Sequence, residues 1–124
     1  MPKRLILNSF SMNAVSHVFH GFWRRPDTRQ TEFNALEAWI ELAQLLERGK
    51  FDALFVADIL GVDASYKESW DTDLKEAVQV PINDSGVLAA TLVAATEHLG
   101  LTFTSSILQE HPSTSPERCR RSTI

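Results

Sequence analysis

Three groups of side chains in this sequence could take part in chemistry: a carboxylate after an apolar run, a pair of histidines, and an acid next to a histidine. Asp58 directly follows FDALFVA. A carboxylate at the carboxyl end of a barrel strand is often catalytic, although a loop-start Asp is the plainer alternative. His17 and His20 have no carboxylate nearby, so we expect ordinary loop histidines and no metal site. Glu110 and His111 follow a predicted strand, but they specify no reaction.

A helix followed by a strand must position Asp58. Thr31 can cap a helix that continues to about Arg48, and apolar residues recur in it at a spacing of three and four. Gly49 is placed for the left-handed residue that ends many helices. Residues 51–57 then form an apolar run that does not alternate, which indicates a parallel strand buried on both faces.

The rest of the chain extends this helix and strand into an alternating pattern. Asn83 or Asp84 can cap a second helix, and Gly100 is placed to close it. In chain order we predict a strand at residues 4–8, a long loop at 9–26, the first helix, the strand at 51–57, a long connection at 59–81, a helix at 85–98 and a strand at 101–105.

This order predicts an α/β fold with a parallel sheet and right-handed crossovers. The connections after strands are long and those after helices are short, as in a (β/α)₈ barrel, whose active-site loops follow the strands. A doubly wound sheet would give the same alternation, but it usually has a glycine-rich first turn. Residues 9–13 (SFSMN) are not such a turn. We therefore expect the N-terminal β-α-β-α-β portion of a TIM barrel, incomplete.

The composition excludes several classes of protein. The 124 residues are 44% hydrophobic and 23% charged, which is ordinary for one small domain. A net charge of -4 argues against nucleic-acid binding. No apolar run approaches the ~20 residues of a membrane helix, and no signal peptide is recognisable. Cys119 is the only cysteine, which leaves no internal disulfide and no cysteine metal site. We expect a cytoplasmic protein.

Six segments resemble the start of the bacterial-luciferase-like FMN-dependent monooxygenases. They are most similar to the branch with nitrilotriacetate monooxygenase component A, dibenzothiophene-sulfone monooxygenase and long-chain alkane monooxygenase. The segments are LNSFSMNAVSH, GFWRRP, WIELAQLLERGKFDALFVADILG, AVQVPIND, TEHLGLTFTSS and EHP. Each alone would be weak, but together they cover residues 7–112 in the family's order and spacing.

The resemblance implies a two-component enzyme built on a (β/α)₈ barrel. In the family, a separate NAD(P)H:flavin reductase supplies reduced FMN (FMNH₂), so NAD(P)H acts only through that partner. The flavin reacts with O₂ to form a C4a-hydroperoxide, which oxygenates a small organic substrate. The protein would hold the flavin, exclude water and orient the substrate. The resemblance also implies that a full-length parent can self-associate, and it leaves the substrate undefined.

The same match implies roles for five residues. Asp58 and Thr104 correspond to cofactor-binding positions beside the flavin ring. His17 corresponds to a first-loop histidine that faces the reaction site, which makes it the candidate catalytic residue. Tyr66 and Gln79 correspond to positions that line the substrate side. The residues after Val62 read Asp-Ala where the family commonly has Tyr-Asp, so the local substrate pocket is expected to differ.

Residues 113–124 depart from the family pattern. The segment STSPERCRRSTI is polar and basic and has no apolar period, which predicts a disordered tail after a barrel portion at residues 1–112. The family continues here with a segment like FxFARxxSTLDHLT. Back-translation read one base earlier gives FNFARKVSTLDH, so our hypothesis is that one nucleotide is lost near Pro112. An intact reading frame at the locus would contradict it.

An incomplete barrel should not work as an enzyme by itself. Three strands leave the sheet with open edges, and a parallel barrel closes only with all its strands. We therefore expect this chain alone to be inactive and to bind FMN weakly. The alternatives are a non-enzymatic truncated product and a small doubly wound binding module.

Overall fold

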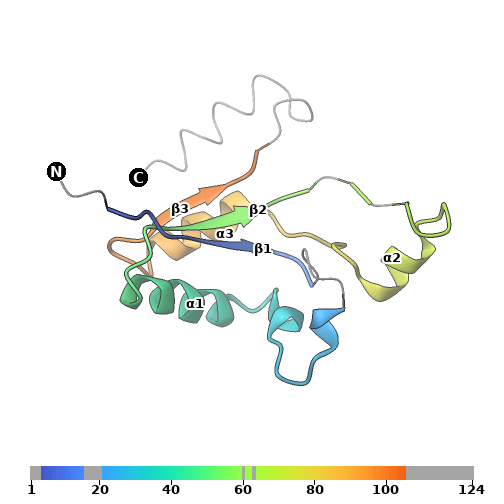
Figure 1. The fold of residues 1–124 in the computed structure, drawn as a ribbon, viewed down its shortest axis with the longest axis horizontal. Helices are drawn as coiled ribbons and strands as arrows, with labels where there is room; N and C mark the ends of the chain where they lie inside the picture. Colours follow the sequence, from blue (N-terminus) through green and yellow to red (C-terminus); the bar gives the residue numbers. More distant parts are fainter. Residues whose placement is uncertain (1–3, 16–20, 60, 63, 106–124) are drawn as a thin grey trace.

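The computed structural model describes residues 4–15, 21–59, 61–62 and 64–105, and its strands form one parallel sheet in the order β1-β2-β3 (Figure 1). The elements in chain order are β1 (Asn8–Met12), the 3-10 helices η1 (Phe22–Arg24) and η2 (Gln30–Glu32), α1 (Leu36–Arg48), β2 (Ala53–Ala57), α2 (Asp71–Glu76), α3 (Ser85–Val93) and β3 (Gly100–Phe103). The predicted α/β class with a parallel sheet is confirmed.

Helices α1 and α3 both pack on one face of this sheet. Side chains alternate along a strand, so Leu54 and Val56 of β2 point to the same face, and both are buried. They join a core to which α1, α3 and the turn before β3 also contribute. The members of this core are Trp39, Ala43, Leu46, Leu54, Val56, Leu88, Leu92 and Leu99. The burial of these apolar side chains is the main force that holds the layers together.

Most of the opposite face of the sheet is open in the described part of the chain, although Met12 at the end of β1 is buried. Phe10 of β1 pairs in register with Phe55 of β2, which pairs with Thr102 of β3. The two phenyl rings are stacked with centroids 5.2 Å apart. Phe10 is nevertheless 55% exposed. We call the face that carries Phe10, Phe55 and Thr102 the open face.

Two carboxylates hold the helix ends in place. Asp84 caps α3, because its Oδ1 accepts hydrogen bonds from the backbone N–H groups of Gly86 at 2.8 Å and Val87 at 3.0 Å. Glu47, at the end of α1, accepts hydrogen bonds at Oε1 from the backbone N–H groups of residues 97, 98 and 99. The Glu47 carboxylate therefore ties α1 to the turn between α3 and β3.

The first strand lies four residues later than the sequence predicted. The prediction placed it at residues 4–8, but β1 is Asn8–Met12, and Leu5 and Ile6 are 81% and 73% exposed. The backbone pairing with β2 decides this position, because Asn8 is in register with Ala53 and the ladder continues to Met12. An apolar run shows that a strand is nearby, but it does not determine the register.

The first helix begins later than predicted. Thr31 lies in η2 instead of capping α1, which starts only after Ala35, where the backbone is extended with ψ 112°. The predicted end at Arg48 is confirmed. Gly49 does not take the expected left-handed conformation, since its φ is -74° and Lys50 has φ 61° instead.

The second half of the chain also differs in detail. The connection predicted at residues 59–81 contains the short helix α2. The predicted cap at Asp84 is confirmed, but α3 ends at Val93 instead of residue 98, and Gly100 belongs to β3. A Cβ atom on Gly100 would lie 2.9 Å from the backbone oxygen of Asp52, so this position requires glycine for close strand approach. Within the described residues, no helix is long and apolar enough to cross a lipid bilayer.

Candidate functional site

The candidate site lies where the three parallel strands end. Because parallel strands run in one direction, their carboxyl ends share one edge of the sheet. Asn13 follows β1, Asp58 follows β2 and Thr104 follows β3. Active sites of α/β barrels are built at this edge.

Asp58 and Thr104 are held side by side at this edge. The backbone N–H of Asp58 donates a hydrogen bond to the Thr104 Oγ1 at 3.4 Å, and the backbone N–H of Thr104 donates to the Val56 carbonyl at 3.3 Å. The Asp58 side chain is half-buried and Thr104 is exposed. Accepting from Asp58 leaves the threonine O–H able to donate, and an ionised carboxylate only accepts. The pair can therefore offer a donor and an acceptor to one ligand.

Three asparagines, which follow β1 or precede α1 and α3, form a hydrogen-bonded network. Asn83 precedes α3, and its backbone N–H donates to the Asn13 carbonyl at 3.1 Å. Its Nδ2 donates to Asn34 Oδ1 at 2.6 Å and to Asn13 Oδ1 at 3.4 Å. Asn13 is only 3% exposed, so its amide is buried with these partners. This asparagine network fixes the chain after β1 against the segments that lead into α1 and α3.

The sequence reasoning missed this network almost completely. The sequence offers Asn83 or Asp84 as the cap of the second helix, and that role belongs to Asp84. Asn13 and Asn34 stand in polar segments without any periodic pattern, so the only available signal was their place after a strand and before a helix. The hydrogen-bonded asparagines are separated by 49 and by 70 positions in the sequence, so no local pattern reveals their contacts.

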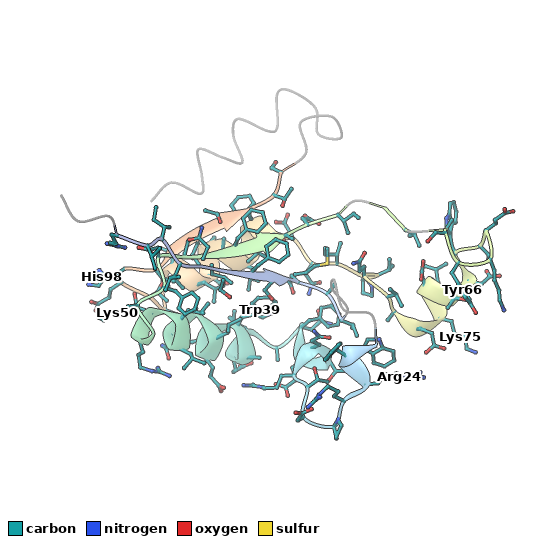
Figure 2. The ribbon with its side chains drawn as sticks, in the orientation of Figure 1. Arg24, Trp39, Lys50, Tyr66, Lys75 and His98 are labelled. Carbon is teal, nitrogen blue, oxygen red and sulfur yellow. The ribbon has the colours of Figure 1, made fainter. Side chains whose placement is uncertain are left out.

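The structure brings together two of the five predicted site residues. Asp58 and Thr104 are in contact, whereas Tyr66 is 55% exposed and has the Lys67 Nζ 5.2 Å from its ring centroid. Figure 2 shows Tyr66 beside the α2 end of the connection, away from the sheet. Gln79 is half-buried with φ 57° between α2 and α3. His17 lies outside the described residues.

The described residues hold no group of three or more His, Cys, Asp or Glu side chains that could bind a metal ion. At the strand ends, the backbone N–H of Asp58 and the Thr104 hydroxyl form a hydrogen bond. The apolar part of the site is the open face, where the stacked rings of Phe10 and Phe55 lie on the strands that lead to this edge. A flat, partly polar ring system fits such a combination of an apolar surface and edge hydrogen bonds.

Two proteins that are similar in sequence to this chain are named monooxygenases. The long-chain alkane monooxygenase of Geobacillus thermodenitrificans (strain NG80-2) is 46% identical over 112 residues, which are 90% of this chain and 26% of the relative. The dimethyl-sulfide monooxygenase of Hyphomicrobium sulfonivorans is 44% identical over 112 residues, 90% of this chain and 23% of the relative. No protein-family model matches the chain.

The fold comparison agrees with the sequence comparison. A crystal structure of a long-chain alkane monooxygenase superposes with a TM-score of 0.93 at 43% identity, covering 98% of this chain and 28% of that one. The chain is a homologue of the luciferase-like FMN monooxygenases. A riboflavin lyase crystallised with modified FMN and riboflavin has a TM-score of 0.88 at 31% identity, over 97% of this chain and 27% of that one.

The relationship decides between the two folds that the sequence allowed. The luciferase-like neighbours are TIM barrels, so the three-stranded sheet is a portion of a (β/α)₈ barrel and not a doubly wound sheet. The chain spans about a quarter of the length of the monooxygenases it matches. In a barrel the helices lie outside, so the open face of this sheet corresponds to the barrel interior.

Proposed function

We propose that this chain supplies the first three strands of a flavin-dependent monooxygenase, in which reduced FMN and O₂ oxygenate a small organic substrate. The observation that carries the proposal is the Asp58–Thr104 pair at the carboxyl edge of a sheet whose relatives are named monooxygenases. The name of one structural neighbour includes FMN, which supports the choice of flavin. The substrate class is open, because the relatives are named for alkanes and for dimethyl sulfide, among others.

The residues at the strand ends fit the edge of a flavin ring. The Asp58 carboxylate would accept a hydrogen bond from a ring N–H, and the Thr104 hydroxyl would donate to a ring carbonyl or nitrogen. The phenyl rings of Phe10 and Phe55 provide an apolar surface that helps to keep water away. When bound, reduced flavin supplies the electrons that activate O₂. His17 is proposed as the catalytic residue, and Tyr66 and Gln79 as substrate-side residues.

The partner and the compartment also belong to this proposal. Reduced flavin would come from a separate NAD(P)H:flavin reductase, and a related protein carries the name nitrilotriacetate monooxygenase component A, which implies a second component there. The full-length enzyme would be cytoplasmic and could form a homo-oligomer. The tail at residues 113–124, for which we propose a frameshift, lies outside the described residues.

A chimera tests the proposed flavin contacts in a complete barrel. Residues 1–112 of this chain replace the matching region of the Geobacillus alkane monooxygenase, and FMN binding is measured by fluorescence quenching. Loss of one hydrogen bond changes binding by about 0.5 to 1.5 kcal/mol, so Thr104→Val should weaken FMN binding roughly 2- to 12-fold. Asp58→Asn should weaken it by at least as much, because its hydrogen bond involves a charged group.

The matched control is Thr91→Val, the same substitution on α3, where the hydroxyl donates to the Leu88 carbonyl at 2.7 Å. This control should bind FMN as tightly as the unsubstituted chimera. If Thr104→Val and Asp58→Asn also leave the FMN dissociation constant unchanged in a folded chimera, the proposed flavin site is wrong. The alternative reading, a non-enzymatic product, would gain support from a folded chimera that binds no FMN at all.

A further inference from the structure

Asn83 holds two other segments of the chain with every hydrogen-bond donor that it has. Its backbone N–H donates to the Asn13 carbonyl at 3.1 Å. Its side-chain NH₂ group donates to Asn34 Oδ1 at 2.6 Å and to Asn13 Oδ1 at 3.4 Å. An asparagine has one backbone N–H and two side-chain N–H donors. Asn13 is therefore held twice by one residue, once through its main chain and once through its side chain.

The segments on both sides of this contact are packed into the protein. Residues 12–15, at the end of β1 and after it, are between 3% and 9% exposed. On the other side, Ser85 of α3 is fully buried, and Asp84 caps the same helix. Because protein interiors are close-packed, Asn83 determines where the buried chain after β1 can lie.

The chain after β1 is also the neighbour of Asp58. The register of β1 and β2 ends with Met12 opposite Ala57. The next residues of the two segments are Asn13 and Asp58. Adjacent strands lie about 4.8 Å apart, so a displacement of Asn13 changes the space directly beside Asp58. The hydrogen bond between Asp58 and Thr104 does not involve the asparagines, so it can persist when their network is broken.

The second segment that Asn83 holds is the end of the connection between β2 and α3. Gln79, one of the proposed substrate-side residues, lies in this connection and is half-buried. The contact between Asn83 and Asn13 therefore fixes the end of this connection against the chain after β1. Both segments flank the carboxyl edge of the sheet, where the candidate site lies.

We propose that Asn83 is a positioning residue, which acts through Asn13 to hold the chain after β1 beside Asp58 and so aligns the substrate with the flavin. This inference rests on the proposed function. Since the Asp58–Thr104 pair is outside the network, Asn83 should affect the alignment of the substrate more than the affinity for FMN. When the substrate is poorly aligned, O₂ takes up two electrons and two protons from reduced flavin and leaves as H₂O₂ without oxygenating the substrate.

Two substitutions of the same kind separate this role from the effects of charge and size. Asn83→Asp replaces the side-chain donor by an oxygen, which then faces the Oδ1 atoms of Asn13 and Asn34. Asn34→Asp adds the same charge within the same network, but it keeps an acceptor for the Asn83 NH₂ group. Asn34→Asp is therefore the matched control.

The variants are made in the chimera with the Geobacillus alkane monooxygenase, which is supplied with reduced FMN, O₂ and a long-chain alkane. The measured quantity is the ratio of oxygenated product to H₂O₂, which does not depend on the fraction of folded protein. Asn83→Asp should lower this ratio roughly 2- to 12-fold, as expected for the loss of a hydrogen bond of about 0.5 to 1.5 kcal/mol. Its dissociation constant for FMN should change less than about twofold, and Asn34→Asp should change neither quantity.

Hydrogen exchange gives a readout that needs no flavin. In the flavin-free chimera, the backbone N–H at position 83 should exchange faster in Asn83→Asp than in the unsubstituted protein, because the contact with Asn13 is weakened. Asn34→Asp should leave this exchange rate unchanged. If Asn83→Asp does not fold, Asn83→Ala keeps the backbone hydrogen bond and should lower the product ratio in the same direction.

The inference is overturned if Asn83→Asp and Asn34→Asp give the same ratio of product to H₂O₂. It is also overturned if Asn83→Asp weakens FMN binding as much as it lowers this ratio. An unsubstituted chimera that binds no FMN would refute the proposed function and this inference with it. A chimera that binds FMN and oxygenates the alkane, but whose product ratio does not respond to substitution of Asn83, would refute this inference alone.

Discussion

Leu54 and Phe55 are neighbours on β2, and replacing each by alanine should lower the free energy of unfolding of this chain by unequal amounts. Leu54 is fully buried in the core beneath α1 and α3. Leu54→Ala removes three carbon groups whose burial contributes about 0.8 kcal/mol each, and it leaves a cavity. We therefore expect the free energy of unfolding to fall by about 3 to 5 kcal/mol. Phe55 is half-buried on the open face, where its ring contact is the partly exposed Phe10. Phe55→Ala should cost only about 1 to 2 kcal/mol, less than for a fully buried phenylalanine.

Urea unfolding followed by circular dichroism measures this difference. With a slope of about 1 to 3 kcal/mol per molar urea, a loss of about 3 to 5 kcal/mol should lower the midpoint for Leu54→Ala by about 1 to 5 M or abolish the cooperative transition. The same pair of substitutions is then made in the chimera that completes the barrel. There Phe55 should become as costly to replace as a buried phenylalanine, about 3 to 5 kcal/mol, because its face becomes the barrel interior.

The opposite order of costs would refute this reasoning. If Phe55→Ala destabilised the monomeric 124-residue chain as much as Leu54→Ala, the open face would have to be covered by the chain itself. If Phe55→Ala remained inexpensive in the chimera, that face would not be the barrel interior. Either result would contradict the assignment of the two faces of the sheet.

Three other predictions follow from single contacts and from the open face. Asp84→Ala should lower the free energy of unfolding by about 1 kcal/mol, because α3 loses its cap, and the melting temperature should fall by about 4 to 8 °C. Asp84→Asn keeps a hydrogen-bond acceptor at this position, so it should retain most of the stability that Asp84→Ala loses. The hydrogen bond from the His98 N–H, followed by those from residues 97 and 99, holds the pKa of Glu47 below its ordinary value. The stabilisation by the Glu47 carboxylate should therefore be present above the ordinary glutamate pKa and should disappear as the pH falls through the lowered pKa of Glu47. The difference in unfolding free energy between the unsubstituted chain and Glu47→Gln should then shrink in acid. A difference in unfolding free energy that does not change with pH would show that the charge of Glu47 is irrelevant. FMN titration of the 124-residue chain should show weak or no binding together with self-association, and a folded monomer with micromolar affinity for FMN would contradict the incomplete-barrel interpretation.

Local interactions explain which elements could be predicted. Asp84 before a run of small residues identifies a helix start, and its cap bonds reach only two and three residues ahead. The end of α1 at Arg48 and the apolar residues of β2 were likewise visible, because helical periodicity and strand burial repeat over a few positions. The start of α1 was not visible in the sequence, because Thr31 belongs to the separate 3-10 helix η2.

Long-range pairing explains what could not be predicted. The position of β1 depends on Asn8 meeting Ala53, and the apolar residues before it, including Leu5, remain exposed. The asparagine network of Asn13, Asn34 and Asn83 likewise joins segments that are distant in the sequence. Neither feature has a periodic signal, because the contacts form only when the sheet and its loops assemble.

The sequence by itself therefore determined the alternating α/β order, the two main helices, the central strand with Asp58 at its end and the resemblance to flavin monooxygenases. Only the tertiary structure decided the register of β1, the contact between Asp58 and Thr104, and which face of the sheet stays open. The physical reason is the range of the interactions. Caps and periodicity act within a few residues, whereas strand register and the pairing of strand ends depend on residues about 45 positions apart.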